Sequence, residues 1–304
     1  MTAWRMRATA PGTPAEEDVR VRRRLVTAVA ALAIAVAGCG GSDEPSAEGG
    51  VPARAEGAQH IHGLGINPAD GSLVIATHAG MFRAAAGQQR AERVGDNYQD
   101  TMGFTVVGPN RFLGSGHPDL RTDLPPLLGL IRSDDAGGEW KPVSLLGKAD
   151  FHVLRAAGRR VYGVNATGGQ ILVSDDGGRT WSDRAPPGAV LDLVAHPQDP
   201  DHVIASGERE LYVSRDAGRT WRPRAVRRAG LLSWTSSDAL MLVDKQGAVH
   251  RSSDAGGRWE QVGEIGGQPA AFAAHGSELF VALHNNEIKV SHDRGRSWQL
   301  RVAA

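Results

Sequence analysis

An eight-residue motif, Ser-x-Asp-x-Gly-x-x-Trp, occurs five times between residues 133 and 298 of this 304-residue chain. Successive copies begin 41, 40, 38 and 39 residues apart. A fixed motif with a period near 40 residues indicates a repeat architecture, in which each repeat is one supersecondary unit. The motif residues of the five copies are Ser133, Asp135, Gly137, Trp140; Ser174, Asp176, Gly178, Trp181; Ser214, Asp216, Gly218, Trp221; Ser252, Asp254, Gly256, Trp259; and Ser291, Asp293, Gly295, Trp298.

Each copy has the residues of a tight turn between two strands. The Asp side chain can accept hydrogen bonds from backbone N–H groups further along the turn, and the Gly adopts positive φ at little cost. Apolar, β-prone residues precede the copies, as in Gln170–Val173 and Glu210–Val213, and the Trp opens the next strand. The motif therefore predicts a β-hairpin turn, with the Trp packed against the sheet.

These residues resemble the Asp box, or BNR repeat, of sialidases, sortilin-type receptors and photosystem assembly factors, which carry it on β-propellers. The resemblance implies an all-β propeller of four-stranded antiparallel blades. Residues 60–304 are enough for six blades of about 40 residues, and a seventh blade would have to lie in the segment before them. Because enzymes and non-enzymes share the Asp box, it indicates a fold and not an activity.

The N-terminal region has the features of an export signal. A basic stretch at residues 20–24 is followed by the apolar run Leu25–Val36, which is too short to span a bilayer. The sequence Val36-Ala37-Gly38-Cys39 resembles the lipobox of bacterial lipoproteins, which implies cleavage before Cys39 and lipidation of its thiol. The alternatives are an uncleaved anchor or an inert buried cysteine.

We therefore expect three regions: a signal peptide at residues 1–38, whose true start lies near residues 19–21, a lipidated flexible tether at 39–58, and a propeller at 59–304. The expected location is extracytoplasmic, lipid-anchored to the bacterial cell membrane. The 34 basic and 34 acidic residues give no electrostatic basis for binding nucleic acid. We expect a monomer.

The expected topology separates two faces. The Asp boxes join the third and fourth strands of each blade, so they define a lower face. The loops entering first strands and those joining second to third strands define an upper face, which contains unrepeated residues. Imidazole, carboxylate and thioether groups are ligands for copper or zinc. The resulting candidate ligand and metal-binding residues are His60, His62, His78, His117 and His152, with Met102 nearby; His284 is also expected on this face. The alternative is that these histidines only hydrogen-bond to loop backbones and one another.

A second hypothesis is glycoside hydrolysis. The propeller and lipobox together resemble bacterial Asp-box lipoproteins labelled glycosyl hydrolases or exo-sialidase-like proteins. Sialidase-like chemistry would need a Tyr activated by a Glu, and no Glu is expected beside the upper-face Tyr98. Ordinary glycosidases use two carboxyl groups about 5–10 Å apart. The weak catalytic candidates are Tyr98, Asp100, Asp119 and Asp150.

A third hypothesis is a module that binds a protein, peptide or glycan through its upper loops. Blade 2 carries an insertion, Pro118–Leu127, which contains three leucines and a Pro-Pro pair. Such a loop could be a contact surface or a lid over the centre of the ring. Of the three hypotheses, the sequence favours binding, of a metal, ligand or protein, over catalysis.

Overall fold

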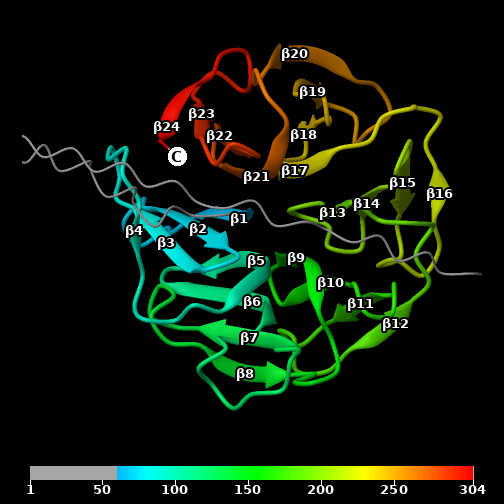
Figure 1. The fold of residues 1–304 in the computed structure, drawn as a ribbon. Helices are drawn as coiled ribbons and strands as arrows, with labels where there is room; N and C mark the ends of the chain where they lie inside the picture. The colour runs from blue at the N-terminus through cyan, green and yellow to red at the C-terminus, as the bar shows by residue number, and fades with distance from the viewer. Residues whose placement is uncertain (1–59, 304) are drawn as a thin grey trace, which may run out of the picture. The chain divides into compact units, whose positions relative to one another are not determined.

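The computed structural model describes residues 60–303, which fold into six four-stranded antiparallel sheets arranged as blades around a common centre (Figure 1). Within this range there is no helix long and apolar enough to cross a membrane. The expected signal peptide, the lipidation site Cys39 and the tether lie outside the described residues. The prediction of a six-bladed all-β propeller is confirmed.

Blades 1–3 follow one another along the chain, and each is a meander of consecutive strands. Their strands are β1 (Ile61–Ile66), β2 (Leu73–Thr77), β3 (Gly80–Ala84) and β4 (Glu92–Arg93); β5 (Asp100–Gly108), β6 (Arg111–His117), β7 (Leu130–Ser133) and β8 (Lys141–Ser144); and β9 (Phe151–Ala157), β10 (Arg160–Asn165), β11 (Ile171–Ser174) and β12 (Ser182–Arg184). The insertion at residues 118–127 lies between β6 and β7, as predicted.

Blades 4–6 have the same organisation. Their strands are β13 (Asp192–Ala195), β14 (Val203–Ser206), β15 (Leu211–Ser214) and β16 (Arg222–Pro223); β17 (Leu231–Ser236), β18 (Ala239–Val243), β19 (Ala248–Ser252) and β20 (Glu260–Glu264); and β21 (Pro269–His275), β22 (Glu278–Leu283), β23 (Ile288–Ser291) and β24 (Gln299–Val302).

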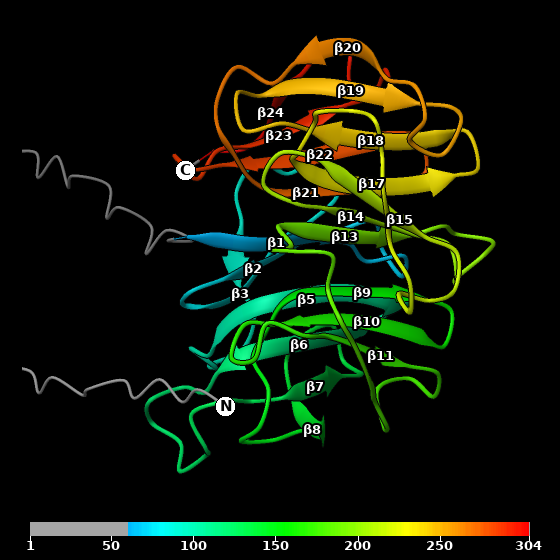
Figure 2. The same ribbon diagram turned by 90° about the vertical axis from the view of Figure 1, so that its right-hand side faces the viewer.

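The ring closes without a shared blade. The first strands β1, β5, β9, β13, β17 and β21 are innermost and contact one another in that order, and β21 returns to contact β1. Seen from the edge of the ring, the strands run from one face to the other (Figure 2). Because every blade is built from one continuous segment, the first and last blades are joined only by non-covalent packing, as the sequence predicted.

The hydrophobic core lies between blades. Six clusters of buried side chains occupy the six seams between neighbouring blades. In the closing seam, Leu73, Ile75 and Phe82 of blade 1 pack with Phe280 and Val290 of blade 6. Full burial of each such side chain contributes about 1.5–3 kcal/mol, so the seams hold the ring together.

All five Asp boxes have the same hydrogen bonds. The Ser Oγ donates to the Asp Oδ1 at 2.8–2.9 Å and accepts the N–H of the motif Gly at 2.8–2.9 Å. The same Asp oxygen accepts the backbone N–H four residues on at 2.8–3.0 Å. The motif Gly has positive φ, as predicted, and so does the residue before it, which the sequence analysis did not anticipate.

The box tryptophans pack across the seams. Each indole joins the cluster that its blade shares with the preceding blade, so the five tryptophans serve five seams. Blade 1 lacks the box Asp and Trp, and no Trp lies in the described closing seam. There the Arg301 Nη2 donates to Ala85 O at 2.9 Å. The degenerate box therefore coincides with the seam that closes the ring.

Candidate functional site

Three β-bulges shape the upper end of the innermost strands in blades 1–3. The pairing of β1 with β2 shifts between Ile61 and Gly63, which leaves His62 as the extra residue. Similar shifts leave Met102 extra in β5 and His152 extra in β9. Because a bulge re-aims the side chain of its extra residue, these three side chains line one cavity, of about 200 Å³.

Two glycines of blade 2 allow close backbone approaches, one to blade 3 and one within the blade. A Cβ on Gly103 would lie 2.3 Å from Phe151 O in blade 3, and one on Gly116 would lie 2.0 Å from Asp100 O. Gly116 also has a φ of 136°, which disfavours other residues. Gly116 thus allows Asp100 to pair directly with His117 across β5 and β6, and Gly103 brings β5 close to β9.

The Asp100 carboxylate is the first centre of the site. Its Oδ2 lies 3.0 Å from His78 Nδ1 and 3.4 Å from His117 Nδ1, and its Oδ1 lies 3.4 Å from His62 Nε2. Burial raises the pKa of Asp100, but the surrounding histidines, led by His62, lower it by more, so the net shift of the pKa is downward. Asp100 is therefore held as an anion.

The Asp150 carboxylate is the second centre. Its Oδ2 lies 2.9 Å from His152 Nε2 and 3.7 Å from the Nε2 of His117. The hydrogen bond to Asp150 raises the pKa of His152. His117 thus has one ring nitrogen toward each carboxylate, and it joins the two centres into one cluster of side chains from three blades.

Both carboxylates have an oxygen without a hydrogen-bond partner. The Oδ1 atoms of Asp100 and Asp150 are buried and accept no aligned hydrogen bond. The two side chains are 13% and 8% exposed. The His62 Nε2 is likewise buried, and its approach to Asp100 lacks hydrogen-bond alignment. Because leaving a buried polar atom unpaired costs free energy, these are the atoms of the site that a ligand could pair with most favourably.

The donor set fits a transition-metal ion. One ligand atom each from His62, His78 and Asp100 lie within 4.8 Å of one another. Ligand atoms of a tetrahedral zinc ion are roughly 3.3 Å apart, given bonds of about 2.0–2.1 Å. Because the His78 ring is 63% exposed, it can turn until its Nδ1 lies at this spacing from the other two ligand atoms. The imidazole and carboxylate groups suit zinc or copper, and the Met102 thioether in the adjoining cavity suits Cu(I).

The cavity below the cluster also contains a fixed ion pair. The Arg155 Nη2 lies 2.7 Å from Asp192 Oδ1, and the other oxygen of Asp192 accepts the Leu232 N–H at 2.8 Å. Arg155 lines both this cavity and the cavity further along the inner strands. The pair ties blades 3, 4 and 5 together beside the site.

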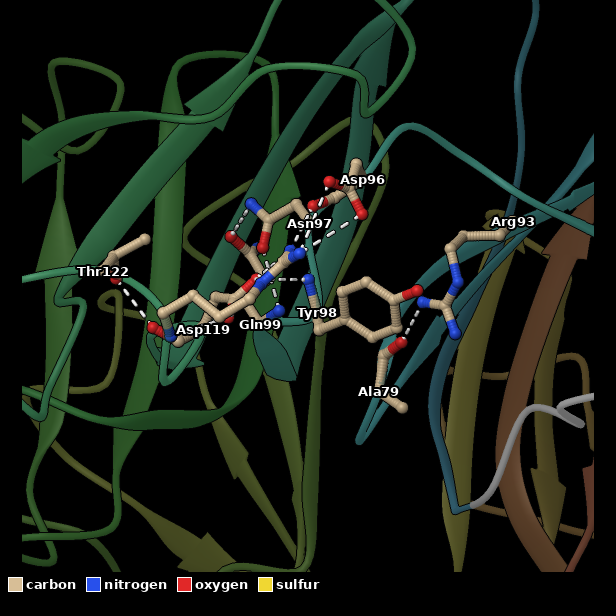
Figure 3. Close-up of polar contacts among 9 residues, drawn as sticks. Ala79, Arg93, Asp96, Asn97, Tyr98, Gln99, Asp119 and Thr122 are labelled. Atoms are coloured by element: carbon tan, nitrogen blue, oxygen red, sulfur yellow. Dashed lines mark hydrogen bonds and ion pairs between the residues drawn. The ribbon is translucent and has the colours of Figure 1, made fainter.

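Asp119 and Tyr98 form a separate group (Figure 3). The Asp119 carboxylate accepts the backbone N–H groups of Tyr98 and Arg121, at 3.0 and 2.9 Å, and the Arg121 guanidinium at 2.6 Å. Hydrogen bonds from Arg121 hold the pKa of Asp119 far below its usual value. The Tyr98 ring lies between Arg93 and Arg121, whose guanidinium carbons are 4.0 and 4.7 Å from its centroid. Asp119 therefore holds the inserted loop and is not brought into contact with the histidines.

Two other upper-face histidines lie at the margin. The exposed His60 ring is 6.4 Å from His78 in an edge-on arrangement and has no described contact with either carboxylate. His284 follows β22 in blade 6, where its N–H donates to Gln268 O at 3.1 Å. The structure thus gathers His62, His78, His117 and His152 around Asp100 and Asp150.

Sequence reasoning missed how these residues are combined. It considered Asp100 and Asp150 as acids of a hydrolase, whereas the structure surrounds both with histidines. The spacing Asp150-x-His152 gave no reliable signal, because Asp150 precedes β9 and His152 is the extra residue of a bulge, so the alternation of side chains along a strand does not relate the two. The roles of Arg93 and Arg121 beside Tyr98 had no signal in the sequence, since long side chains from β4 and from the inserted loop meet there.

The comparisons with known proteins agree with this fold. The profile of the family described as Sortilin, neurotensin receptor 3 (Sortilin-Vps10) matches residues 129–248, which is less than half of the chain. No curated protein matches the chain. The chain is thus a Sortilin-Vps10-like Asp-box β-propeller.

Solved structures with this architecture come from proteins of different function. The GH74 xyloglucanase from Xanthomonas campestris has a TM-score of 0.53 and 20% identity, over 80% of this chain and 45% of the enzyme, so the chain spans less than half of the enzyme's length. YCF48 bound to D1 peptide has a TM-score of 0.51 and 14% identity, over 80% and 82% of the two chains. A chain of a nidogen/laminin complex has a TM-score of 0.56 and 14% identity, over 72% and 88%. At these identities the likeness concerns the fold.

Proposed function

We propose that this protein is an extracytoplasmic, lipid-anchored β-propeller that binds a transition-metal ion at its upper face. The observation that carries the proposal is the pair of buried carboxylates, Asp100 and Asp150, each surrounded by imidazole groups and each with an oxygen left unpaired. His62, His78 and Asp100 supply the first ligands.

The alternative is a network of hydrogen bonds with no metal ion. Such a network would stabilise the loops best if each buried acceptor received a donor. Here Asp150 Oδ1 receives none, Asp100 Oδ1 has only the poorly aligned His62 Nε2 at 3.4 Å, and three ligand atoms lie within 4.8 Å of one another. A cation among them would neutralise the buried anions and occupy the unpaired atoms, which supports metal binding over the network.

Metal content of the full-length protein, purified in detergent, tests the proposal. After mild chelation and incubation with Cu(II) or Zn(II), we expect at least one equivalent to remain bound after desalting. The variants His78→Ala and Asp100→Asn should bind much less. The matched control is His292→Ala, which removes an exposed histidine paired with Glu278 on the lower face. A wild-type protein that binds neither metal, or an Asp100→Asn variant that binds as well as wild type, would refute the proposal.

The membrane anchor has its own test. The proposal predicts that the chain incorporates radiolabelled palmitate and fractionates with membranes. A Cys39→Ser variant should lose the label and appear in the soluble extracytoplasmic fraction. Equal membrane association of wild type and variant would contradict lipid anchoring while leaving metal binding untouched.

A protein or peptide ligand is a second candidate function, supported by the inserted loop. Leu120 at its tip is 100% exposed and Leu124 is 43% exposed, and a similar propeller, YCF48, was solved with a peptide. Crosslinking in intact membranes, with wild type and a Leu120→Ser/Leu124→Ser variant, tests this role. An unchanged set of crosslinked partners would exclude the loop as the contact surface.

A further inference from the structure

We propose that the site holds two metal ions, with the imidazole of His117 between them. This inference rests on the proposed function and specifies its stoichiometry. The two ions correspond to the two carboxylates, one at Asp100 and one at Asp150.

His117 is the group that connects the centres. Its Nδ1 lies 3.4 Å from Asp100 Oδ2, and its Nε2 lies 3.7 Å from Asp150 Oδ2. The two nitrogens point away from each other in the ring plane, so a single ion cannot bind both. A ring between two anionic centres can instead bind one ion through each nitrogen.

The donors divide between the ions without competition. The first ion would take His62 Nε2, His78 Nδ1 and Asp100, which lie within 4.8 Å of one another, and His117 Nδ1 would become the fourth ligand after a movement of its 43% exposed ring. The second ion would take Asp150 and His152 Nε2, which lie 2.9 Å apart, and His117 Nε2, which lies 3.7 Å from Asp150 and would have to move closer to His152, so this ion would have three ligands. Four protein ligands are typical of closed structural sites, whereas three leave a position for water or a further ligand. His152 also lines the cavity of about 200 Å³, so the open position is expected to face that cavity.

Each ion would also provide a partner for one carboxylate oxygen. Asp150 is more than nine-tenths buried and its Oδ1 has no partner, whereas Asp100 is 13% exposed and its Oδ1 has only the poorly aligned His62 Nε2 at 3.4 Å. One ion at Asp100 would leave Asp150 Oδ1 unpaired. Neutral imidazole has one N–H, so binding an ion at both nitrogens releases that proton to solvent and leaves an imidazolate bridge.

The competing arrangement is one ion at Asp100, with a doubly protonated His117 donating to Asp150. The two arrangements differ in stoichiometry and in magnetism. An imidazolate bridge couples the unpaired electrons of two Cu(II) ions antiferromagnetically, so the electron paramagnetic resonance (EPR) signal at low temperature accounts for only part of the copper. Isolated Cu(II) ions give the full signal.

The test is a titration of the full-length protein with Cu(II) at neutral pH, followed by copper analysis and EPR spin counting on the same sample. We expect two equivalents of copper and a spin count well below two. The Asp150→Asn and His152→Ala variants should bind one equivalent with full spin intensity, and His117→Ala should show no spin coupling. Circular dichroism and thermal unfolding confirm that each variant folds.

The failures are distinguishable. If the wild type binds no copper, the proposed function itself is wrong. If it binds one equivalent with full spin intensity, the metal site stands and the second ion does not. If it binds two uncoupled ions, the bridge through His117 is refuted.

Discussion

The two faces of the propeller use aspartate in opposite ways. On the lower face, each Asp-box carboxylate accepts a Ser hydroxyl and a backbone N–H, and the same bonds recur in five blades. On the upper face, Asp100 and Asp150 occur once each, lie among histidines and keep an unpaired oxygen. The repeated aspartates form hydrogen bonds within their own turns, whereas the two unrepeated aspartates remain available for a ligand.

The histidines of the two faces also differ in their surroundings. A change of pH should reveal this difference most strongly. His202 is 2% exposed, lies face to face with His196 and meets the edge of Trp234. Burial, and then the positive charge of Arg215, lower the pKa of His202 to about 4. The folded state favours neutral His202, so its contribution is complete above the unfolded pKa near 6.5 and is lost as pH falls toward 4. The loss amounts to about 3 kcal/mol by pH 4.

Urea unfolding between pH 7.5 and 4 measures this effect. The free energy of unfolding should fall more steeply in the wild type than in a His202→Gln variant, which cannot gain the proton. Parallel curves for the two proteins would show that His202 does not resist protonation. The control His292→Gln, at an exposed position, should follow the wild type.

The second effect is metal-dependent stability. Zn(II) at 100 times its dissociation constant should raise the free energy of unfolding of the wild type by about 2.7 kcal/mol for one site. Asp100→Asn should abolish the increase. It should also cost the metal-free protein some stability at neutral pH, because the histidines hold the pKa of Asp100 below its usual value and so favour its anion in the folded state. Thermal unfolding with and without Zn(II) measures both quantities. A large loss of stability in the metal-free variant would show that Asp100 is structural, like an Asp-box carboxylate.

A smaller effect is expected on the lower face. Ser174→Ala leaves the buried N–H of Gly178 without its acceptor, which lies at 2.8 Å in the wild type. An unsatisfied buried donor costs about 2 kcal/mol, or roughly 4–8 °C in the unfolding temperature of a domain of this size. Metal binding should be unchanged. Ser277→Ala, in an exposed turn, is the control, and equal losses in the two variants would refute the assigned role of the box serine.

The smallest effect concerns the inserted loop. Leu120→Ser should change the free energy of unfolding by less than about 0.5 kcal/mol, because a fully exposed side chain loses no packing. Denaturant unfolding measures it. A larger loss would mean that Leu120 is covered in solution, by a second copy of the chain or by the rest of the loop.

The fold was predictable because its signals are local and repeated. Ser, Asp, Gly and Trp within eight residues specify one turn, and their spacing sets the blade length and the number of blades. What the sequence did not indicate is that each Trp packs into the seam with the preceding blade, since that contact joins residues from different repeats. Phe151 and Trp181, with ring centroids 5.0 Å apart, belong to the same blade but share a seam that blade 2 completes.

The site was only partly predictable. Topology placed His62, His78, His117 and His152 on one face, because loop position follows from strand order. Asp100 is the partner of the first three, which depends on a bulge in β1 and on the close approach of β5 and β6 at Gly116, whereas His152 is paired with Asp150. A one-residue bulge leaves no mark in hydrophobic periodicity, so these distances could come only from the three-dimensional arrangement.

The closing seam has a consequence for the order of the chain. Blades 6 and 1 meet through a buried apolar cluster, as other neighbours do, although without a box Trp, and no strand is exchanged between them. A circularly permuted chain, with a short linker from residue 303 to residue 60 and new ends between β12 and β13, should fold to the same propeller. The order of the blades around the ring therefore does not depend on which blade comes first in the chain.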